Sequence, residues 1–596
     1  MTYRAPVKDF MFGLKELAGL EQLTQIPAFA DHGLDTAQAV LDECAKFNEN
    51  IVAPLNWEGD KNPSWFKDGV VTTTPGFKDA FRQLGEGGWQ GLQHPEEFGG
   101  QGLPKAIGAA CIEMINSANL SFALCPLLTD GAIEALLTAG SDEQKATYLT
   151  PMVEGRWTGT MNLTEPQAGS DLAAVRTKAE PQPDGTYKIF GTKIFITYGE
   201  HDMAENIVHL VLARVVGAPE GVKGISLFIV PKFMVNADGS LGARNDAHCV
   251  SIEHKMGIKA SPTAVLQFGD HGGAVGYLVG QENRGLEYMF IMMNAARFAV
   301  GVQGIAVAER AYQKAVQYAR DRVQSRPVDG STPGAAAIIH HADVRRMLMT
   351  MRAYTEGCRS LALVAGAAYD AAHHHPDAET RKVNQTFYEF MVPLVKGYST
   401  EMSLEVTSLG VQVHGGMGFI EETGAAQYYR DAKILTIYEG TTAIQANDLV
   451  GRKTGRDGGQ TAKALAGQIE QTEALLQARD SAAAQSFARS LKAARLAFLD
   501  AVDFIAANGR ANPNAAYAGS VPYLMLTGNL MAGWQMGRAM LAAQDCLNEG
   551  EDVAFMQAKL VTAQFYAEHI LVKVPGLRDA IVAGADSVCA MALDAF

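Results

Sequence analysis

Cysteine is scarce in this sequence and widely spaced. Seven cysteines occur among 596 residues, an odd number with no C-x-x-C pair. A disulfide framework or a structural zinc site normally shows closely spaced, paired cysteines. We therefore expect free thiols in a reducing compartment, which favours a cytoplasmic protein.

Long apolar stretches and an excess of basic residues are also missing. No uninterrupted apolar run reaches the roughly 18 residues of a membrane span, and the amino-terminal MTYRAPVKDF lacks the apolar core of a signal peptide. Lys and Arg number 50 against 65 Asp and Glu, which gives a formal net charge of -15. We expect no membrane span, and this charge does not favour binding to nucleic acid or to an anionic membrane.

Common nucleotide and metal motifs are absent as well. The sequence contains no G-x-G-x-x-G, no G-x-x-x-x-G-K-[ST] and no H-E-x-x-H, which disfavours a Rossmann dehydrogenase and a P-loop enzyme. The consecutive His373, His374 and His375 would point about 100° apart on a helix and could not share one ion. We expect no bound metal.

The spacing of apolar residues changes along the sequence and divides it into four parts. Apolar residues recur at helical spacing before Trp157, and short β-rich runs bounded by Gly, Pro, Asp and Asn then extend to about Gly280. Ala-rich helical patterns follow Arg284, and the Gly-rich stretch GRKTGRDGGQTAK interrupts them like a linker. The predicted fold class is α+β: a helical amino-terminal domain, a β-barrel-like middle domain, a helical bundle and an additional helical domain. Their predicted bounds are 1–155, 156–283, 284–454 and 455–596.

Four short segments fit this layout: MNLTEPQAGSDLAAVRT from Met161, GTKIFITYG from Gly191, QVHGGMGF from Gln412 and YRDAKILTIYEGTTAIQ from Tyr429. Together and in this order they resemble the acyl-CoA dehydrogenase family over about residues 45–450. The helical remainder resembles the appended domain of long bacterial members, including 3-methylthiopropionyl-CoA dehydrogenases. The resemblance implies α,β-dehydrogenation of an acyl-CoA thioester to the trans-2-enoyl-CoA, as in fatty-acid β-oxidation or 3-methylthiopropionyl-CoA breakdown. It also implies FAD as cofactor and an electron-transferring flavoprotein as electron acceptor.

That reaction removes an α-proton and a β-hydride, so the site needs a base on one face of the substrate and a flavin on the other. Glu439, between Tyr438 and Gly440, is the predicted base, because an apolar acyl pocket would desolvate its carboxylate and raise its pKa. Some family members place the base just before an Arg on the long helix. Ala296 stands there in this sequence and cannot accept a proton.

The resemblance also implies contacts with FAD and substrate. Leu163 and Thr164 would meet the pyrimidine side of the flavin, Ser170 a phosphate, and Phe195 and Thr197 the ring, with Thr197 near N5. A second group would reach the FAD of a neighbouring subunit: Arg322, Gln324, Gln412 and Gly416. Three further residues are assigned to the cofactor: Met161, Gly169 and Thr441. The implied substrate contacts are Ser170, Asn294, Arg297, Tyr438 and Gly440, while the Glu439 N–H and a flavin ribityl hydroxyl would hold the thioester oxygen.

Two alternatives share this fold. An acyl-CoA oxidase reoxidises its flavin with oxygen, but such relatives usually depart from the TEP-x-A-G-S-D and YEGT patterns kept here. A flavin-containing nucleic-acid-binding damage-response protein would need a basic carboxyl-terminal domain, whereas residues 455–596 hold 11 Lys or Arg against 14 Asp or Glu. That acidity also disfavours a role in docking to a membrane surface. The length and branching of the acyl chain are not predicted.

The additional helices should determine the assembly. Their apolar stripes must be buried, and if they fold over the face on which shorter relatives form tetramers, a homodimer remains. Lys492 and Arg495 are predicted on the outer face of one such helix. Its predicted buried face is formed by Leu491, Leu496, Phe498 and Leu499.

Overall fold

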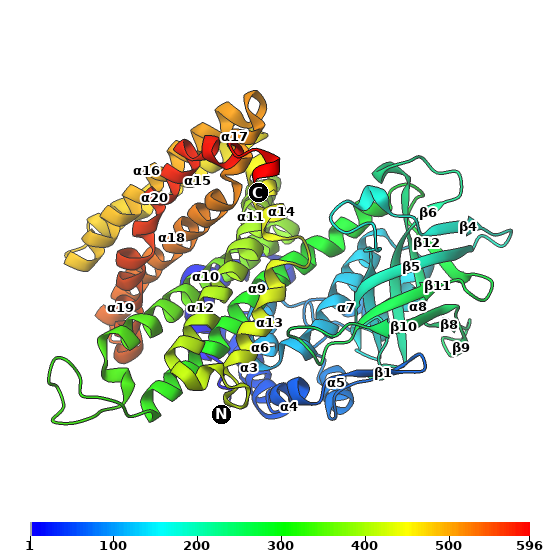
Figure 1. Cartoon of the computed structure of the whole chain (residues 1–596), viewed down its shortest axis with the longest axis horizontal. Coiled ribbons are helices and arrows are strands. Elements are labelled where there is room, and N and C mark those ends of the chain that lie inside the picture. Colours follow the sequence, from blue (N-terminus) through cyan, green and yellow to red (C-terminus); the bar gives the residue numbers. More distant parts are fainter. Residues whose placement is uncertain (1–2) are drawn as a thin grey trace.

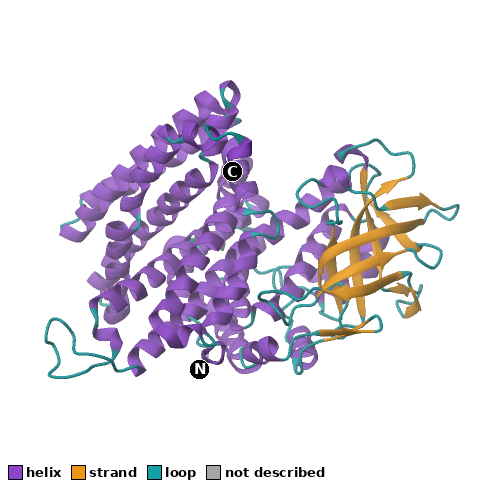
Figure 2. Cartoon of the chain, viewed as in Figure 1, coloured by secondary structure: helices purple, strands orange, loops and turns teal. Residues whose placement is uncertain are grey.

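The computed structural model describes residues 3–596, which form a helical body with a β-domain at one end (Figures 1 and 2). Local capping explains where two of the first helices begin: Asn119 accepts a hydrogen bond from the Phe122 N–H, and Ser141 forms a capping box with Gln144. The amino-terminal helices are α1 (Val7–Phe12), α2 (Leu20–Leu23), α3 (Leu34–Phe47), α4 (Leu55–Lys61), α5 (Phe77–Glu86), α6 (Lys105–Ala118), α7 (Leu120–Ala139) and α8 (Asp142–Val153).

A small hairpin lies among these helices. Strands β1 (Trp65–Lys67) and β2 (Val70–Thr72) pair antiparallel. Asp68 and Gly69 between them both have positive φ, which is the conformation that favours Asp-Gly in two-residue hairpins. The Asp-Gly pair was therefore a hairpin signal.

The middle domain is a closed barrel with extra strands. Strand β5 pairs with both β4 and β12, β12 with β7, β7 with β6, and β6 with β4, so these five strands form a ring. Strand β3 joins β6 in parallel, while β11 and β10 extend the sheet beyond β5. The predicted barrel-like domain is thus confirmed. The strands are β3 (Trp157–Asn162), β4 (Lys178–Pro181), β5 (Tyr187–Thr197), β6 (Asn206–Val215), β7 (Ile225–Pro231), β8 (Phe233–Val235), β9 (Leu241–Arg244), β10 (Ala247–Ile252), β11 (Thr263–Phe268) and β12 (Ala274–Val279).

The long helix α9 is the centre of the helical bundle. It packs against α6, α7, α10 and α12. Helices α7 and α9 are long and apolar enough to cross a membrane by composition, but 78% and 72% of their most apolar windows are buried inside the protein, as in core helices. The bundle helices are α9 (Gly285–Asp321), α10 (Ala342–His374), α11 (Ala378–Pro393), α12 (Ser399–His414), α13 (Ala425–Lys433) and α14 (Thr442–Asp448).

The additional helices are docked on this bundle. Helices α18 and α19 contact α10, and a Cβ on Gly528 of α18 would come within 2.2 Å of the Tyr398 ring. The Tyr398 hydroxyl donates to Asn529 Oδ1 at 2.7 Å, which joins the two parts. The helices are α15 (Gln460–Gln477), α16 (Ala482–Ala511), α17 (Pro513–Ala518), α18 (Ser520–Glu549), α19 (Val553–His569), α20 (Val574–Ala583) and α21 (Ala585–Cys589).

The segment before α15 differs from the predicted linker. Residues Leu449–Gly455 continue α14 as a π-helical turn, and only a short turn separates them from α15. Thr454 is buried and shares a 2.9 Å hydrogen bond with the Tyr523 hydroxyl of α18. Because Thr454 is anchored on α18, this stretch is a packed junction.

Helix α16 corrects the predicted buried face. Leu491 and Phe498 are fully buried, but Leu496 is 47% exposed and Arg495 is buried. Arg495 pairs with Glu473 of α15 through its Nε at 2.6 Å. Positions 491, 495 and 498 follow the three-and-four helical spacing, whereas 496 lies about 140° away from 491. Arg495 was predicted to face solvent because it is charged, but it is buried in an ion pair between α16 and α15.

Candidate active site

Glu439 lies in a short loop between two helical segments. A 3-10 turn ends at Thr436, and α14 begins at Thr442 with Thr441 as its N-cap. Glu439 has φ of 55°, and the following Gly440 has φ of 89°. Holding a glutamate in this left-handed region costs on the order of 1 kcal/mol or more, so surrounding contacts must fix the loop.

Lys396 supplies such a contact. It is fully buried in the π-helical turn Leu394–Tyr398, between α11 and α12. Its Nζ donates to the carbonyl oxygens of Leu435 at 2.8 Å and Gly440 at 2.7 Å. These acceptors lie on either side of Glu439 in the chain, so one ammonium group ties both ends of the loop. Sequence reasoning missed Lys396, although a single charge within the apolar run FMVPLVKGY was a signal of a buried polar role.

The surroundings of Glu439 prepare its carboxyl group for proton transfer. Burial raises the pKa of Glu439 from 4.5 to about 7, and the nearby charges of Lys396 and Arg297 oppose this rise. Burial likewise lowers the pKa of Lys396 to about 8, against the attraction of Glu439. Among the described residues, nothing accepts a hydrogen bond from the Glu439 backbone N–H. The loop thus presents a carboxyl group that titrates near neutral pH beside a free backbone donor.

Hydrogen bonds connect Tyr438 of this loop to the wall of a cavity. Its hydroxyl donates to Gln303 Oε1 of α9 at 2.5 Å, and Gln303 Nε2 donates to Asn116 Oδ1 of α6 at 2.9 Å. Asn116 lines a cavity of about 80 Å³, which Ala295 and Ala299 of α9 also line. The cavity therefore lies along α9 at Ala295 and Ala299, and two hydrogen bonds in series connect its wall to the loop of the predicted base.

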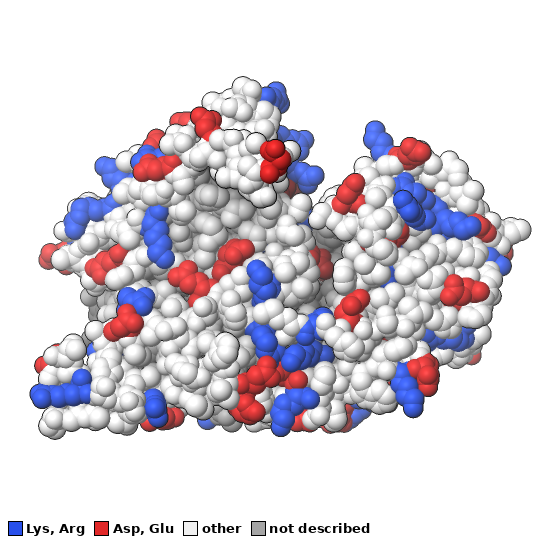
Figure 3. Space-filling model, viewed as in Figure 1, with Lys and Arg blue, Asp and Glu red and all other residues white. Residues whose placement is uncertain are grey.

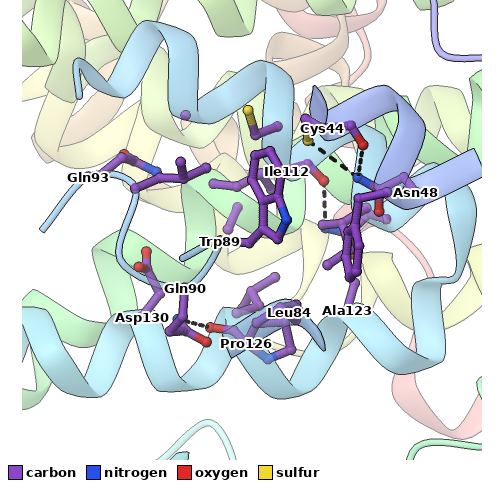
Figure 4. Close-up of a pocket in the computed structure, with 18 of the residues that line it drawn as sticks. Cys44, Asn48, Leu84, Trp89, Gln90, Gln93, Ile112, Ala123, Pro126 and Asp130 are labelled. Carbon is purple, nitrogen blue, oxygen red and sulfur yellow. Dashed lines mark hydrogen bonds between the residues drawn. The ribbon is translucent and has the colours of Figure 1, made fainter. Parts of the chain in front are cut away.

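Most of the cavity wall is apolar, with a few polar groups (Figure 4). Trp89 stacks on Phe47, with ring centroids 6.0 Å apart. The Asn48 amide donates to the Cys44 carbonyl at 2.9 Å, and the Gln90 amide donates to the Pro126 carbonyl at 3.0 Å. No sequence pattern pointed to these residues, because they come from α3, α7 and the loop after α5.

A second cavity, of about 630 Å³, is polar and lies on the other side of α9. Asn294 and Arg297, both predicted substrate contacts, line it together with Arg452, Lys453 and Arg456. The Arg297 Nε has no hydrogen-bond partner among the described residues. Arg297 is therefore near Glu439 and also lines a cavity with four cationic side chains and three acidic ones, the latter at Glu389, Asp448 and Asp457.

The TEPQAGSD turn and strand β5 are joined by a buried ion pair. Lys193 Nζ of β5 donates to the Leu163 carbonyl and to Glu165 Oε1, each at 2.8 Å, and the Ile194 N–H donates to the Thr164 carbonyl at 2.9 Å. Burial would raise the pKa of Glu165, but Lys193 and hydrogen bonds from Thr177 and Arg176 lower it to about 2. The structure thus brings Leu163 and Thr164 to the strand of Phe195 and Thr197.

This junction presents open groups that fit FAD. Phe195 has φ of 59° and is 59% exposed, while Gly169 and Ser170 are exposed and Met161 is buried on β3. A Cβ on Gly169 would meet no atom within 4 Å. An exposed aromatic ring next to free backbone and hydroxyl groups suits the isoalloxazine ring and the phosphates of FAD.

The remaining predicted cofactor residues lie elsewhere. Arg322 and Gln324 are exposed after the end of α9, and Gln412 and Gly416 are exposed at the end of α12. These two helix ends meet, because Tyr318 stacks on His414 with centroids 4.3 Å apart. The loop after α9 lies on the side of the helical body opposite the β-domain (Figure 1). Within one chain, these residues and the TEPQAGSD turn are not brought together.

The face shown in Figure 3 gives no support to the nucleic-acid alternative. On the face shown in Figure 3, basic and acidic side chains are interspersed and form no continuous basic band. Nucleic-acid binding surfaces are usually clustered and basic.

Comparison with protein-family models confirms the sequence resemblance. Residues 35–156, 160–271 and 283–453 match the N-terminal, middle and C-terminal domains of acyl-CoA dehydrogenase, and residues 465–592 match the acetyl-CoA dehydrogenase C-terminal-like domain. The chain belongs to the acyl-CoA dehydrogenase family and is an FAD-dependent oxidoreductase that dehydrogenates acyl-CoA.

Individual relatives agree with this assignment. The chain is 56% identical, over 100% of both lengths, to 3-methylmercaptopropionyl-CoA dehydrogenase of Ruegeria pomeroyi. An acyl-CoA dehydrogenase from Bacillus anthracis complexed with FAD has the same fold, with a TM-score of 0.75 at 22% identity over 93% of this chain and 90% of that one. A chain from a structure of the electron transferring flavoprotein of Acidaminococcus fermentans is 27% identical, with a TM-score of 0.57 over 69% of this chain and 96% of that one.

Proposed function

We propose that this enzyme oxidises short acyl-CoA thioesters, including 3-methylmercaptopropionyl-CoA, with Glu439 as the catalytic base. The observation that carries the proposal is the 80 Å³ cavity whose wall is linked by hydrogen bonds, from Asn116 through Gln303 to Tyr438, to the Glu439 loop. It is smaller than the roughly 150 Å³ cavity that holds benzene in an engineered protein, so only a few heavy atoms of an acyl chain fit. The stacked Trp89 and Phe47 offer the aromatic contacts that favour a thioether sulfur.

In the proposed mechanism, the Glu439 carboxylate takes the α-proton of the bound thioester. Its backbone N–H donates to the thioester oxygen and stabilises the negative charge that develops there. Lys396 holds the loop, so that the carboxylate and the N–H keep their relative positions. Bound FAD supplies the two-electron acceptor for the β-hydride. Arg297 limits the pKa rise of Glu439, which keeps an ionised fraction available at neutral pH.

A panel of thioesters tests the substrate class. Propionyl-, butyryl-, octanoyl- and 3-methylmercaptopropionyl-CoA would be mixed anaerobically with the holoenzyme, and flavin bleaching would be followed. We expect fast bleaching with the short and thioether chains and at least a tenfold slower reaction with octanoyl-CoA. Trp89→Ala should enlarge the cavity and so reduce the difference in bleaching rate between the short thioesters and octanoyl-CoA. Trp65→Ala, in strand β1 where the side chain is exposed, should leave that difference unchanged. A faster reaction with octanoyl-CoA in the unaltered enzyme would refute the short-chain proposal.

We also propose a homodimer in which each FAD site is completed by the partner. Arg322, Gln324, Gln412 and Gly416 are exposed at one end of the body, away from the TEPQAGSD turn. The same end exposes apolar side chains that an interface would cover, namely Val323, Met417, Phe419 and Ile420. Their clustering supports assembly through this end.

For the electron acceptor, we propose an electron-transferring flavoprotein. The YEGT and TEP-x-A-G-S-D patterns support this over an acyl-CoA oxidase. Turnover with the flavoprotein but negligible oxygen consumption is the expected result, and rapid oxygen consumption without it would favour the oxidase. Seven free cysteines, six of them buried, support a reducing compartment such as the cytoplasm.

A further inference from the structure

The β-domain brings together two histidines and an aspartate that are distant in sequence. Asp246 immediately precedes β10, His248 lies on β10, and His271 lies in the turn between β11 and β12. Strand β10 is at the edge of the sheet. These three side chains belong neither to the base loop nor to the cavities described above.

The spacing of their ligand atoms matches a metal site. His271 Nδ1 is 3.2 Å and His248 Nε2 is 3.5 Å from the same oxygen, Asp246 Oδ1. Two ligands bound at about 2.0–2.1 Å to a tetrahedral ion are roughly 3.3–3.4 Å apart. One ligand atom from each residue lies within 4.8 Å of the others, so a small rotation of a histidine ring would complete the set.

The carboxylate is already oriented for this role. Asp246 Oδ2 accepts hydrogen bonds from the backbone N–H groups of His271 at 2.7 Å and Gly273 at 3.1 Å. Partial burial opposes ionisation, but these hydrogen bonds lower the pKa of Asp246. With Oδ2 fixed by the turn, Oδ1 faces both histidines, as a carboxylate ligand held by its surroundings would.

We propose that Asp246, His248 and His271 bind one divalent transition-metal ion of the zinc class, with solvent in the fourth position. Two imidazoles and a carboxylate are a common ligand set for Zn²⁺ and related ions. The ion would link the edge strand β10 to the β11–β12 turn and so stabilise the barrel. The alternative is an ordinary ion pair between Asp246 and protonated histidines.

The two readings predict opposite pH dependence. Metal ions bind the neutral form of imidazole, so affinity should rise with pH. An ion pair needs the protonated form, so it weakens as pH rises. The consecutive His373, His374 and His375 do not form a competing site, because they point in different directions, His373 stacks on Tyr369 and His375 Nδ1 accepts the Asp377 N–H.

The experiment is a Zn²⁺ titration of chelator-treated holoenzyme by calorimetry, repeated with Co²⁺ and read by its visible absorption. We expect one saturable site per chain and a higher melting temperature with metal. His271→Ala and Asp246→Asn should each weaken binding at least tenfold. His271 is largely exposed, so its variant should fold, and His248→Gln gives an independent check.

Two control variants locate the site. The exposed His254, outside the cluster, and His375 would each be changed to Ala, and both should bind metal as the unaltered enzyme does. The proposal is overturned if the cluster variants retain full affinity, if binding is lost in His375→Ala, or if affinity falls as pH rises.

Discussion

Replacing Glu439 by Gln should abolish catalysis and, above neutral pH, stabilise the protein. The folded state raises the pKa of this carboxyl group from 4.5 to about 7. Between these values the folded state binds a proton that the unfolded state releases, so the stabilising contribution is full below pH 4.5 and is lost as pH rises through about 7. A shift of about 2.5 units at about 1.36 kcal/mol each corresponds to roughly 3 kcal/mol at pH 8. The amide has no ionised form and avoids that penalty.

Two assays separate the catalytic and the stability effects. Anaerobic flavin reduction by the unaltered enzyme should increase about tenfold from pH 6 to pH 8, because the ionised fraction of a group with pKa about 7 rises from about a tenth to about nine-tenths. Glu439→Gln should reduce flavin at least 10²–10⁴-fold more slowly at any pH. Denaturant unfolding should show a stability gain for the variant that grows between pH 5 and pH 8.

An exposed glutamate elsewhere in the chain provides the control for this prediction. Glu422→Gln removes one carboxylate without touching the base loop, and it should leave both the rate and the pH dependence of stability unchanged. Rapid bleaching by Glu439→Gln would refute its role as the base. A stability difference that is equal at pH 5 and pH 8 would refute the argument from burial.

Three further predictions concern the loop, the cofactor and the assembly. Lys396→Met removes both carbonyl contacts and a positive charge, so the midpoint of the rate–pH profile should move upward by on the order of one unit, while Lys396→Arg should restore part of the shift. A purely structural role would lower the rate without moving the midpoint. Arg322→Ala should release FAD more readily on dilution, because its guanidinium would otherwise pair with a phosphate; flavin retention equal to that of the unaltered enzyme at every protein concentration contradicts this. Light scattering of the intact enzyme should give a dimer, and a form ending near Lys453 should be insoluble or larger, because α18 and α19 cover the bundle; a tetrameric intact enzyme disproves the idea.

The sequence predicted the order of helical and β-rich parts, because within each part the apolar residues recur at a regular helical or strand spacing. It could not predict contacts that depend on how elements cross. Leu496 and Arg495 are adjacent, and their chemistry suggested the reverse of their burial, since the ion pair to Glu473 becomes visible only when α15 packs on α16. The predicted linker proved to be a packed junction for the same reason, because the hydrogen bond from Thr454 to α18 depends on how the helices pack.

The candidate site likewise combines residues that local motifs predicted with residues that only the packing of helices and strands revealed. Glu439 and Thr164 could be predicted from the sequence, because the motifs that contain them have distinctive local patterns. Lys396 and Gln303 act on Glu439 and Tyr438 from other helices, and a single lysine or glutamine in a helix has no such pattern. Asp246 and His271 are 25 residues apart and meet through the β10–β11 pairing, so local spacing could not reveal them.

Backbone strain offers a physical link between these site segments. Phe195 and Glu439 both have positive φ without being glycine and lie in motif segments, and Ser325, which follows the predicted cofactor residue Gln324, has positive φ as well. Such conformations persist only where surrounding contacts outweigh their cost of about 1–3 kcal/mol. At Glu439 the contact is visible, because the buried Lys396 ammonium binds the carbonyls on both sides of the residue. Burying a lysine with only two carbonyl acceptors and one nearby carboxylate is costly. Here its hydrogen bonds hold the backbone of the proposed base, and its charge lowers the pKa of that base. That coupling is why the Lys396 variants test the mechanism and not only the fold.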